Sequence, residues 1–230
     1  MRSKHSFIGL LLLAVAGISG CQSTTHTDVV VVQEVAAYDV APDYDLASVH
    51  GLVPGEWLHF DLIGDDSHGD YWHGSVTKSG LDARWVDGVW ATPTLTEMVL
   101  VHEPSGATIR RSMTLYLDDY GQEVKLSLGN GLVCYPQLTN DIPRYSYAGD
   151  YGDLGIMLCS DGSELHGIWD LYSNPDQSAD FVTLSTSWYG GTAESSIEVT
   201  QTLNPDGRIT AYALSLYVPE YGVTVWLDSL

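Results

Sequence analysis

An internal repeat constrains the fold of this chain more than any other feature of its sequence. Glu103-Pro104-Ser105-Gly106 recurs as Asn204-Pro205-Asp206-Gly207, and the segment 115–121 recurs as 216–222. Both pairs lie at the same offset of 101 residues, with no gap between them. Because one offset is kept across two turns and the segment that joins them, we interpret the chain as two related units.

Each unit has the composition of antiparallel hairpins. The repeated turns supply a proline, whose φ is preset for a turn, and a glycine, which can adopt a positive φ. Between Ile209 and Leu216 the bulkier side chains alternate with smaller ones, which is the two-residue period of a strand. The 14 Tyr, seven Trp and 23 Gly also favour strands and tight turns over helices. We therefore predict an all-β protein.

A meander of about 75 residues can bury only one face, so the two units are expected to pack on each other. They would form an antiparallel sandwich or close into one pseudo-twofold barrel. We place the β repeats at 55–130 and 149–230, with about five strands each and a connector at 131–148, and expect them to form one domain. Gly167-Ile168-Trp169 is similar to the Gly-x-Trp with which lipocalin-like and avidin-like barrels begin. This resemblance concerns shape and implies no ligand.

The start of the chain has the pattern of an export signal. Basic residues within the first five positions precede an apolar run from Phe7 to Ile18, which ends in Ile-Ser-Gly-Cys at Cys21. The apolar run, about 12 residues, is too short to cross a membrane as a helix. Its ending resembles the lipobox of bacterial lipoproteins. The resemblance implies that 1–20 is a signal peptide and that Cys21 is the first mature residue, carrying acyl chains such as palmitate.

By the same resemblance, residues 21–54 would form a lipidated tether and N-terminal arm. Gln22 follows the cysteine, which in the sorting of enteric lipoproteins implies the outer membrane. We therefore expect a protein of the cell envelope, attached to the membrane through its N-terminal lipid and facing the periplasm or the exterior. Within the arm, Val29 to Val32 is a β-prone run that we expect to be paired, because exposed apolar strands aggregate.

The charge of the chain limits its partners. It has 30 Asp and Glu against nine Lys and Arg, which gives a formal net charge of −21. Loss of the signal would remove two of the nine positive charges. Nucleic-acid binding depends on Lys and Arg that neutralise phosphates, so no nucleic-acid partner is expected. The same charge disfavours adsorption to anionic lipids. Membrane attachment would therefore depend on the acyl chains at Cys21.

The three cysteines fit an exported protein. If Cys21 carries lipid, Cys134 and Cys159 remain as an even pair in an oxidising compartment, and each ends an apolar, strand-like run. We predict a disulfide between them in preference to two buried thiols. Closing this loop would stabilise the fold by roughly 3.5 kcal/mol.

Potential metal ligands are densest between residues 59 and 73, as His59, Asp61, Asp65, Asp66, His68, Asp70 and His73. His59 and Asp61 share one face of a predicted strand, and one hairpin register places His73 opposite Asp61. Two imidazoles and a carboxylate could hold a divalent transition metal, and the aspartates of the turn could instead offer oxygens to calcium. Because Asp, Ser and Gly are also ordinary turn residues, a plain turn is the alternative.

Glu97 and Glu198 occupy equivalent positions in the two repeats. A pseudo-twofold axis could bring them together as acid and base on a polysaccharide, whereas on an outer face they would be ordinary exposed carboxylates. The sequence has no Gly-rich phosphate loop, no Gly-x-Ser-x-Gly and no His-Glu-x-x-His. These absences from the sequence make an enzyme less expected.

The first unit is rich in aromatic residues: Trp57, Tyr71, Trp72, Trp85 and Trp90. We expect most of them in the core, with one or two at the mouth of a pocket. The preferred hypothesis is an envelope lipoprotein that acts as a binding or structural module for an unidentified ligand, such as a carbohydrate or a small molecule. The alternatives are a carbohydrate-active enzyme and a metal-binding envelope protein.

Overall fold

The computed structural model describes residues 43–140 and 142–230. The predicted signal peptide, Cys21, Val29 to Val32 and most of the predicted arm lie outside the described residues. In the described part, no helix is long and apolar enough to cross a membrane.

Strands dominate the described residues. They are β1 (Tyr44–Asp45), β2 (Trp57–Asp66), β3 (Tyr71–Gly80), β4 (Arg84–Val86), β5 (Val89–His102), β6 (Ala107–Asp118), β7 (Glu123–Leu128), β8 (Val133–Thr139), β9 (Tyr145–Ser146), β10 (Tyr151–Cys159), β11 (Glu164–Ser173), β12 (Ala179–Tyr189), β13 (Thr192–Leu203), β14 (Ile209–Val218) and β15 (Val223–Ser229). The helix α1 (Ala47–His50) has four residues.

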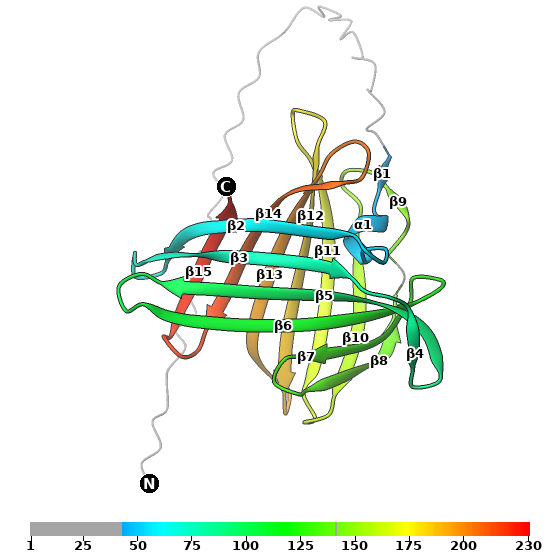
Figure 1. The fold of residues 1–230 in the computed structure, drawn as a ribbon, viewed down its shortest axis with the longest axis horizontal. Coiled ribbons are helices and arrows are strands. Elements are labelled where there is room, and N and C mark those ends of the chain that lie inside the picture. The colour runs from blue at the N-terminus through cyan, green and yellow to red at the C-terminus, as the bar shows by residue number, and fades with distance from the viewer. Residues whose placement is uncertain (1–42, 141) are drawn as a thin grey trace, which may run out of the picture. The chain divides into compact units, whose positions relative to one another are not determined.

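The strands form a closed antiparallel barrel. One sheet contains 13 strands in the order β3-β2-β15-β14-β13-β12-β11-β10-β8-β7-β6-β5-β4, and β3 also pairs with β5. Because β4 pairs with β5 alone, twelve strands close the ring and β4 extends beside it. In Figure 1, β2, β3, β5 and β6 run across the view and β11 to β13 cross behind them. The all-β prediction is confirmed, and the architecture is a barrel.

Buried side chains alternate with more exposed ones along the barrel strands, as the sequence pattern predicts. In β3, Trp72, Val76 and Lys78 are buried, while the odd-numbered residues between them are more exposed. The register carries this face around the ring, since buried Leu100 on β5 lies opposite buried Ile109 on β6. In a closed barrel, one face of every strand points into the interior. The face with the buried side chains is therefore the inward face.

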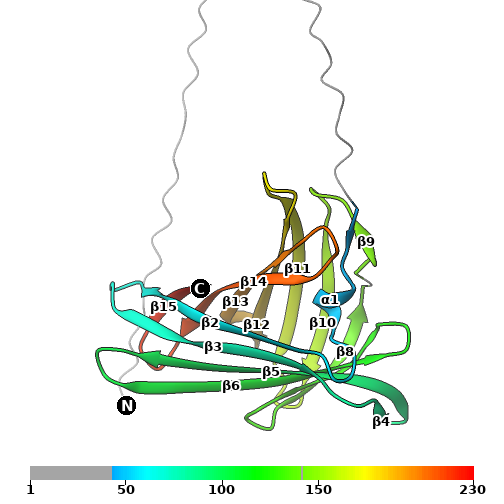
Figure 2. The ribbon, with the colours of Figure 1, turned by 45° about the horizontal axis from the view of Figure 1, so that its top comes forward.

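The first described segment covers one end of the barrel, which we name the capped end. Tyr44, Leu46 and Val49 are buried against Trp169, Phe181 and neighbouring side chains. The backbone N–H of Leu52 donates to the hydroxyl of Thr94 at 3.0 Å. Figure 2 shows β1 and α1 at this end, where β1 pairs with β9. The opposite end, which we name the rim, holds the turns at 67–70, 103–106 and 219–222.

The predicted disulfide is present. Cys134 on β8 lies directly opposite Cys159 on β10, and their sulfur atoms are 2.01 Å apart. Both cysteines are buried, next to Met157. The range 131–148, expected as a connector, thus contains β8, which is a full member of the barrel.

Candidate functional site

Part of the inward face is apolar yet only partly buried. We name it the inner apolar wall; its members are Met113, Leu115, Leu126, Leu128, Leu165, Ile197, Val199 and Leu216. Met113 retains 41 % of its accessible surface, and the other members are half-buried. Their inward direction follows from the register, because Met113 lies opposite buried Thr96, and Leu115 lies opposite Leu126. At the capped end, by contrast, inward residues such as Leu171 and Leu203 are fully buried.

Lys78 extends from β3 into the barrel interior. Lys78 retains 7 % of its accessible surface, and its Nζ donates a hydrogen bond to Oε1 of Gln201 on β13 at 3.0 Å. In the register Lys78 lies opposite Leu58 on β2 and Thr96 on β5. Within the described residues Lys78 forms no salt bridge. The hydrogen-bond partner of this buried ammonium is therefore neutral; another titratable group buried on the inward face of this part of the barrel is Glu123, opposite Leu117.

Burial sets the protonation of Lys78. It disfavours the charged form and lowers the pKa of the ammonium to about 8. The hydroxyl of Tyr212, on the residue opposite Gln201, is also buried, and its pKa is raised above the ordinary value for the same reason. At neutral pH Lys78 is therefore mostly charged in an interior that disfavours charge.

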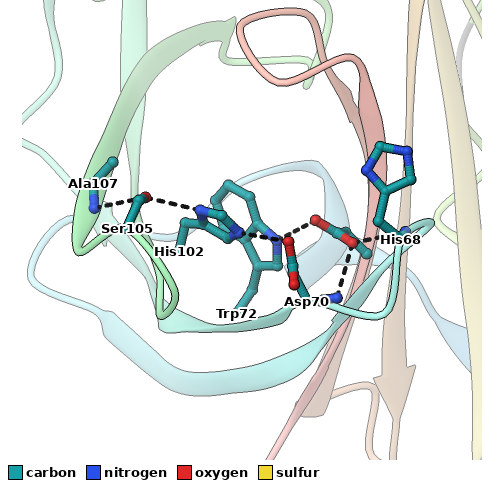
Figure 3. A network of polar contacts seen from close by, with 7 residues as sticks. His68, Asp70, Trp72, His102, Ser105 and Ala107 are labelled. Atoms are coloured by element: carbon teal, nitrogen blue, oxygen red, sulfur yellow. Dashed lines mark hydrogen bonds and ion pairs between the residues drawn. The ribbon is translucent and has the colours of Figure 1, made fainter.

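A second cluster lies at the rim. One ligand atom from each of Asp66, Asp70 and His102 lies within 4.8 Å of the others, and we name these three residues the rim cluster. The Nε2 atom of His102 is 3.3 Å from Oδ2 of Asp70, and its Nδ1 is 2.8 Å from the hydroxyl of Ser105 (Figure 3). His102 also packs on the ring of Trp72, with the ring centres 4.7 Å apart.

Asp66 organises the turn between β2 and β3. Its Oδ1 accepts hydrogen bonds from the backbone N–H groups of His68 at 2.8 Å and Asp70 at 3.1 Å, and its Oδ2 accepts one from the indole of Trp72 at 2.9 Å. Burial acts to raise the pKa of Asp66, but the hydrogen bonds from Trp72, His68 and Asp70 outweigh it, so the pKa lies below its ordinary value. Two carboxylates and an imidazole could hold a divalent cation. Without a cation, both oxygens of Asp66 and both ring nitrogens of His102 already have hydrogen-bond partners.

The residues first predicted as metal ligands are placed differently. His59 and Asp61 share the outer face, as predicted, with Nε2 of His59 3.2 Å from Oδ1 of Asp61. His73 lies opposite Ile63 instead of Asp61, and its Nδ1 is 3.0 Å from Oε1 of Glu103. The three therefore do not form a three-ligand cluster among the described residues.

The rim cluster uses Asp66 and Asp70 from the predicted ligand-rich segment, but its histidine comes from β5. Sequence reasoning missed His102 because only the pairing of β3 with β5 brings it to this turn. It missed Lys78 as well, although a signal was present. Side chains alternate between the two faces of β3, and Lys78 lies on the same face as Trp72 and Val76, where an apolar residue is expected.

Glu97 and Glu198 do not meet. Both are exposed on the outer face, Glu97 on β5 opposite Ser112 and Glu198 on β13 opposite Leu184. By the shorter way around the ring, the strands β3, β2, β15 and β14 lie between them. The two carboxylates therefore form no acid and base pair.

The prediction that most aromatic residues of the first unit are buried is wrong. Trp72 is fully buried, but Trp57, Tyr71, Trp85 and Trp90 are 62 %, 43 %, 71 % and 42 % exposed. Trp57 and Tyr71 have outward parity on β2 and β3. Trp85 and Trp90 lie opposite each other on the β4–β5 hairpin beside the barrel, with ring centres 5.6 Å apart.

Two shallow pockets open on the surface, apart from the inner apolar wall. One of about 450 Å³ is lined by residues that include Tyr151, Asp153 and Trp169. The other, of about 350 Å³, is lined by residues that include Glu194 and Tyr217. Neither pocket is lined by Lys78 or by the rim cluster, so the two groups of polar side chains described above lie outside both pockets.

The described residues thus offer two kinds of chemistry. The barrel interior combines an apolar wall with one ammonium, and the rim combines two carboxylates with an imidazole. No protein-family model matches the chain, and no curated protein and no solved structure matches it either.

Proposed function

We propose that this protein is a binding module whose ligand is an apolar or amphiphilic molecule held inside the barrel. The observation that carries the proposal is the inner apolar wall, whose side chains face inward and yet keep part of their surface in contact with solvent. A barrel of twelve strands encloses more space than side chains readily fill, and barrels of intermediate size hold ligands in this way. Covering such a wall is favourable by about 25 cal/mol per Å² of apolar surface.

We also propose that the module is exported and anchored in the cell envelope by acyl chains on Cys21, at the outer membrane. The disulfide supports export, because such bonds persist in oxidising compartments. The outward positions of β13 are polar, namely Glu194, Ser196, Glu198, Thr200 and Thr202, and this part of the outer face supports anchoring through lipid instead of through the barrel wall.

A duplication of hairpins is proposed as the origin of the barrel. The runs β5-β6-β7 and β13-β14-β15, which contain the two copies of the repeated sequence, follow one another in the same direction around the ring. Four strands separate β5 from β13 one way and six the other way, so the copies are not related by an exact twofold. The ring can be divided into five strands that contain the first copy (β2, β3, β5, β6 and β7) and five that contain the second (β11 to β15). The two remaining strands, β8 and β10, lie between these sets on one side only, which makes the two separations unequal.

The proposed function is tested with a neutral fluorescent probe, N-phenyl-1-naphthylamine, and the soluble protein that begins at Gln22. The probe should bind with increased fluorescence, and Met113→Asp should weaken its binding by tenfold or more, because a carboxylate is placed on the inner apolar wall. Thr114→Asp is the matched control on the outer face of the same strand. Absence of binding, or equal loss in both variants, would overturn the proposal.

Metal binding is a second candidate, favoured by the rim cluster. Metal content measured by mass spectrometry should show one divalent cation per chain that His102→Ala removes and His73→Ala keeps, since His73 pairs with Glu103 on the outer face. If the protein contains no metal, the rim cluster serves only to stabilise the turn between β2 and β3. A carbohydrate-active enzyme that uses Glu97 and Glu198 as acid and base is not proposed, because the two residues lie on separate parts of the outer face.

A further inference from the structure

Among the described residues, no carboxylate forms an ion pair with the ammonium of Lys78, and burial alone lowers its pKa. An ammonium has three N–H donors, and the hydrogen bond to Gln201 uses one of them. Burying a charge is costly unless it is paired and fully hydrogen-bonded. The isolated Lys78 is therefore a feature that a purely structural barrel would not need.

Neutral groups face Lys78 from each neighbouring strand. In the register these are Leu58 on β2 and Thr96 on β5, and Tyr212 on β14 lies opposite Gln201. Thr94, two residues from Thr96, is buried as well, and its hydroxyl oxygen accepts the N–H of Leu52, which leaves its own O–H to donate. Lys78 and these hydroxyls are the groups on this part of the inward face that can donate to an anion.

The donors continue directly into the inner apolar wall. Lys78 lies opposite Thr96, Thr96 lies opposite Met113, and Met113 lies opposite Leu128. On the other side, Gln201 is followed at the next two inward positions of β13 by Val199 and Ile197. A polar point with one positive charge that lacks an ion-pair partner thus adjoins an apolar surface that is partly exposed. Arg111, at the next inward position of β6 after Met113, is paired with Glu220 at 2.7 Å.

We infer that the barrel binds a long-chain monocarboxylate, with its carboxylate at Lys78 and its hydrocarbon chain along the inner apolar wall. This inference rests on the proposed function and names its ligand class. One ammonium matches one negative charge, whereas a phosphate ester carries more charge than this site neutralises. The formal charge of −21 also disfavours a multiply charged anion, so the local ammonium has to select the head group.

The test compares dodecanoate with dodecan-1-ol, which has the same chain without the charge. Each competes with N-phenyl-1-naphthylamine for the soluble protein that begins at Gln22, at pH 7. Lys78→Met should weaken dodecanoate binding by tenfold or more and leave dodecanol and probe binding unchanged. Lys125→Met is the matched control, because Lys125 is on the outer face and pairs with Asp87.

A pH series on the unaltered protein gives an independent readout. Dodecanoate is ionised throughout the range from pH 7 to pH 10, whereas the free Lys78 has a pKa of about 8. Dodecanoate affinity should therefore fall at alkaline pH. Dodecanol affinity should stay level, which controls for a change in the barrel itself. Glu123 has a pKa of about 7, so the series is repeated on Glu123→Gln, in which the alkaline fall in dodecanoate affinity should remain.

The outcomes separate the two levels of the proposal. If the probe and both competitors fail to bind, the proposed function itself is wrong. If all three bind but dodecanoate affinity is independent of Lys78 and of pH, the ligand is neutral and only this inference is overturned. If Lys78→Met does not fold, the pH series on the unaltered protein decides between these results.

Discussion

The side chains of Lys78 and Gln201 meet inside the barrel, where Nζ of Lys78 donates to Oε1 of Gln201 at 3.0 Å. The two residues belong to β3 and β13, which are not neighbours in the sheet. The contact therefore joins two walls of the barrel across its interior. It places a titratable group where the stability of the ligand-free protein should depend on its charge.

Replacement of Lys78 by methionine should stabilise the ligand-free protein by about 2 kcal/mol at pH 7. The pKa shift from 10.5 to about 8 corresponds to about 3 kcal/mol, and loss of the bond to Gln201 offsets about 1 kcal/mol. Below pH 8 the lysine is protonated in the folded and the unfolded state, so the penalty is complete there. It diminishes as the pH rises from 8 to 10.5. Urea denaturation at pH 7 and pH 10.5 measures both effects, and a variant less stable than the parent at pH 7 would contradict the prediction.

Replacement of Glu123 by glutamine should stabilise the protein above pH 7. Glu123 lies opposite Leu117, and burial raises the pKa of its carboxyl to about 7. The unfolded carboxyl ionises near its ordinary pKa of 4.5, so the stability of the parent falls as the pH rises from 4.5 to 7, by at most about 3 kcal/mol. Urea midpoints should coincide for the parent and Glu123→Gln at pH 4 and separate by pH 8. Glu198→Gln, on the exposed outer face, serves as the control and should show no such separation.

Removal of the disulfide should lower the free energy of unfolding by roughly 3.5 kcal/mol, which is the chain-entropy value for its loop. The Cys134→Ala/Cys159→Ala variant tests this in urea, because both side chains are buried and alanine introduces no new polar group. Reduction with dithiothreitol should destabilise the parent by a similar amount and leave the variant unchanged. A reductant effect of equal size on both proteins would show that it acts elsewhere.

The sequence pattern predicted the features that depend on local chemistry. The alternation around Tyr212 and Leu214 identified an inward face, and both residues are buried in the barrel. The cysteines at the ends of two apolar runs identified the disulfide. In each case the determining residues are close in sequence or restricted to very few partners.

Features that depend on pairing between distant strands could not be predicted. The register of β2 with β3 places His73 opposite Ile63, and a difference of two residues was enough to separate it from Asp61. His102 reaches the rim cluster only because β3 pairs with β5. Trp57 and Trp85 are exposed because aromatic residues suit the outer face of a strand as well as a core, so composition alone did not locate them.

Replacement of Asp66 by asparagine should destabilise the rim by about 2 kcal/mol at pH 7. The carboxylate accepts hydrogen bonds from the indole of Trp72 and from two backbone N–H groups, and a neutral amide oriented toward them cannot satisfy all three donors. Because the pKa of Asp66 lies below its ordinary value, its contribution is present above the unfolded pKa of 3.8 and is lost as the pH falls through the folded pKa. The difference between the parent and Asp66→Asn should therefore narrow below about pH 4. Asp65→Asn is the matched control, since Asp65 is exposed on the same strand, and equal effects of the two variants would show that Asp66 does not organise the turn.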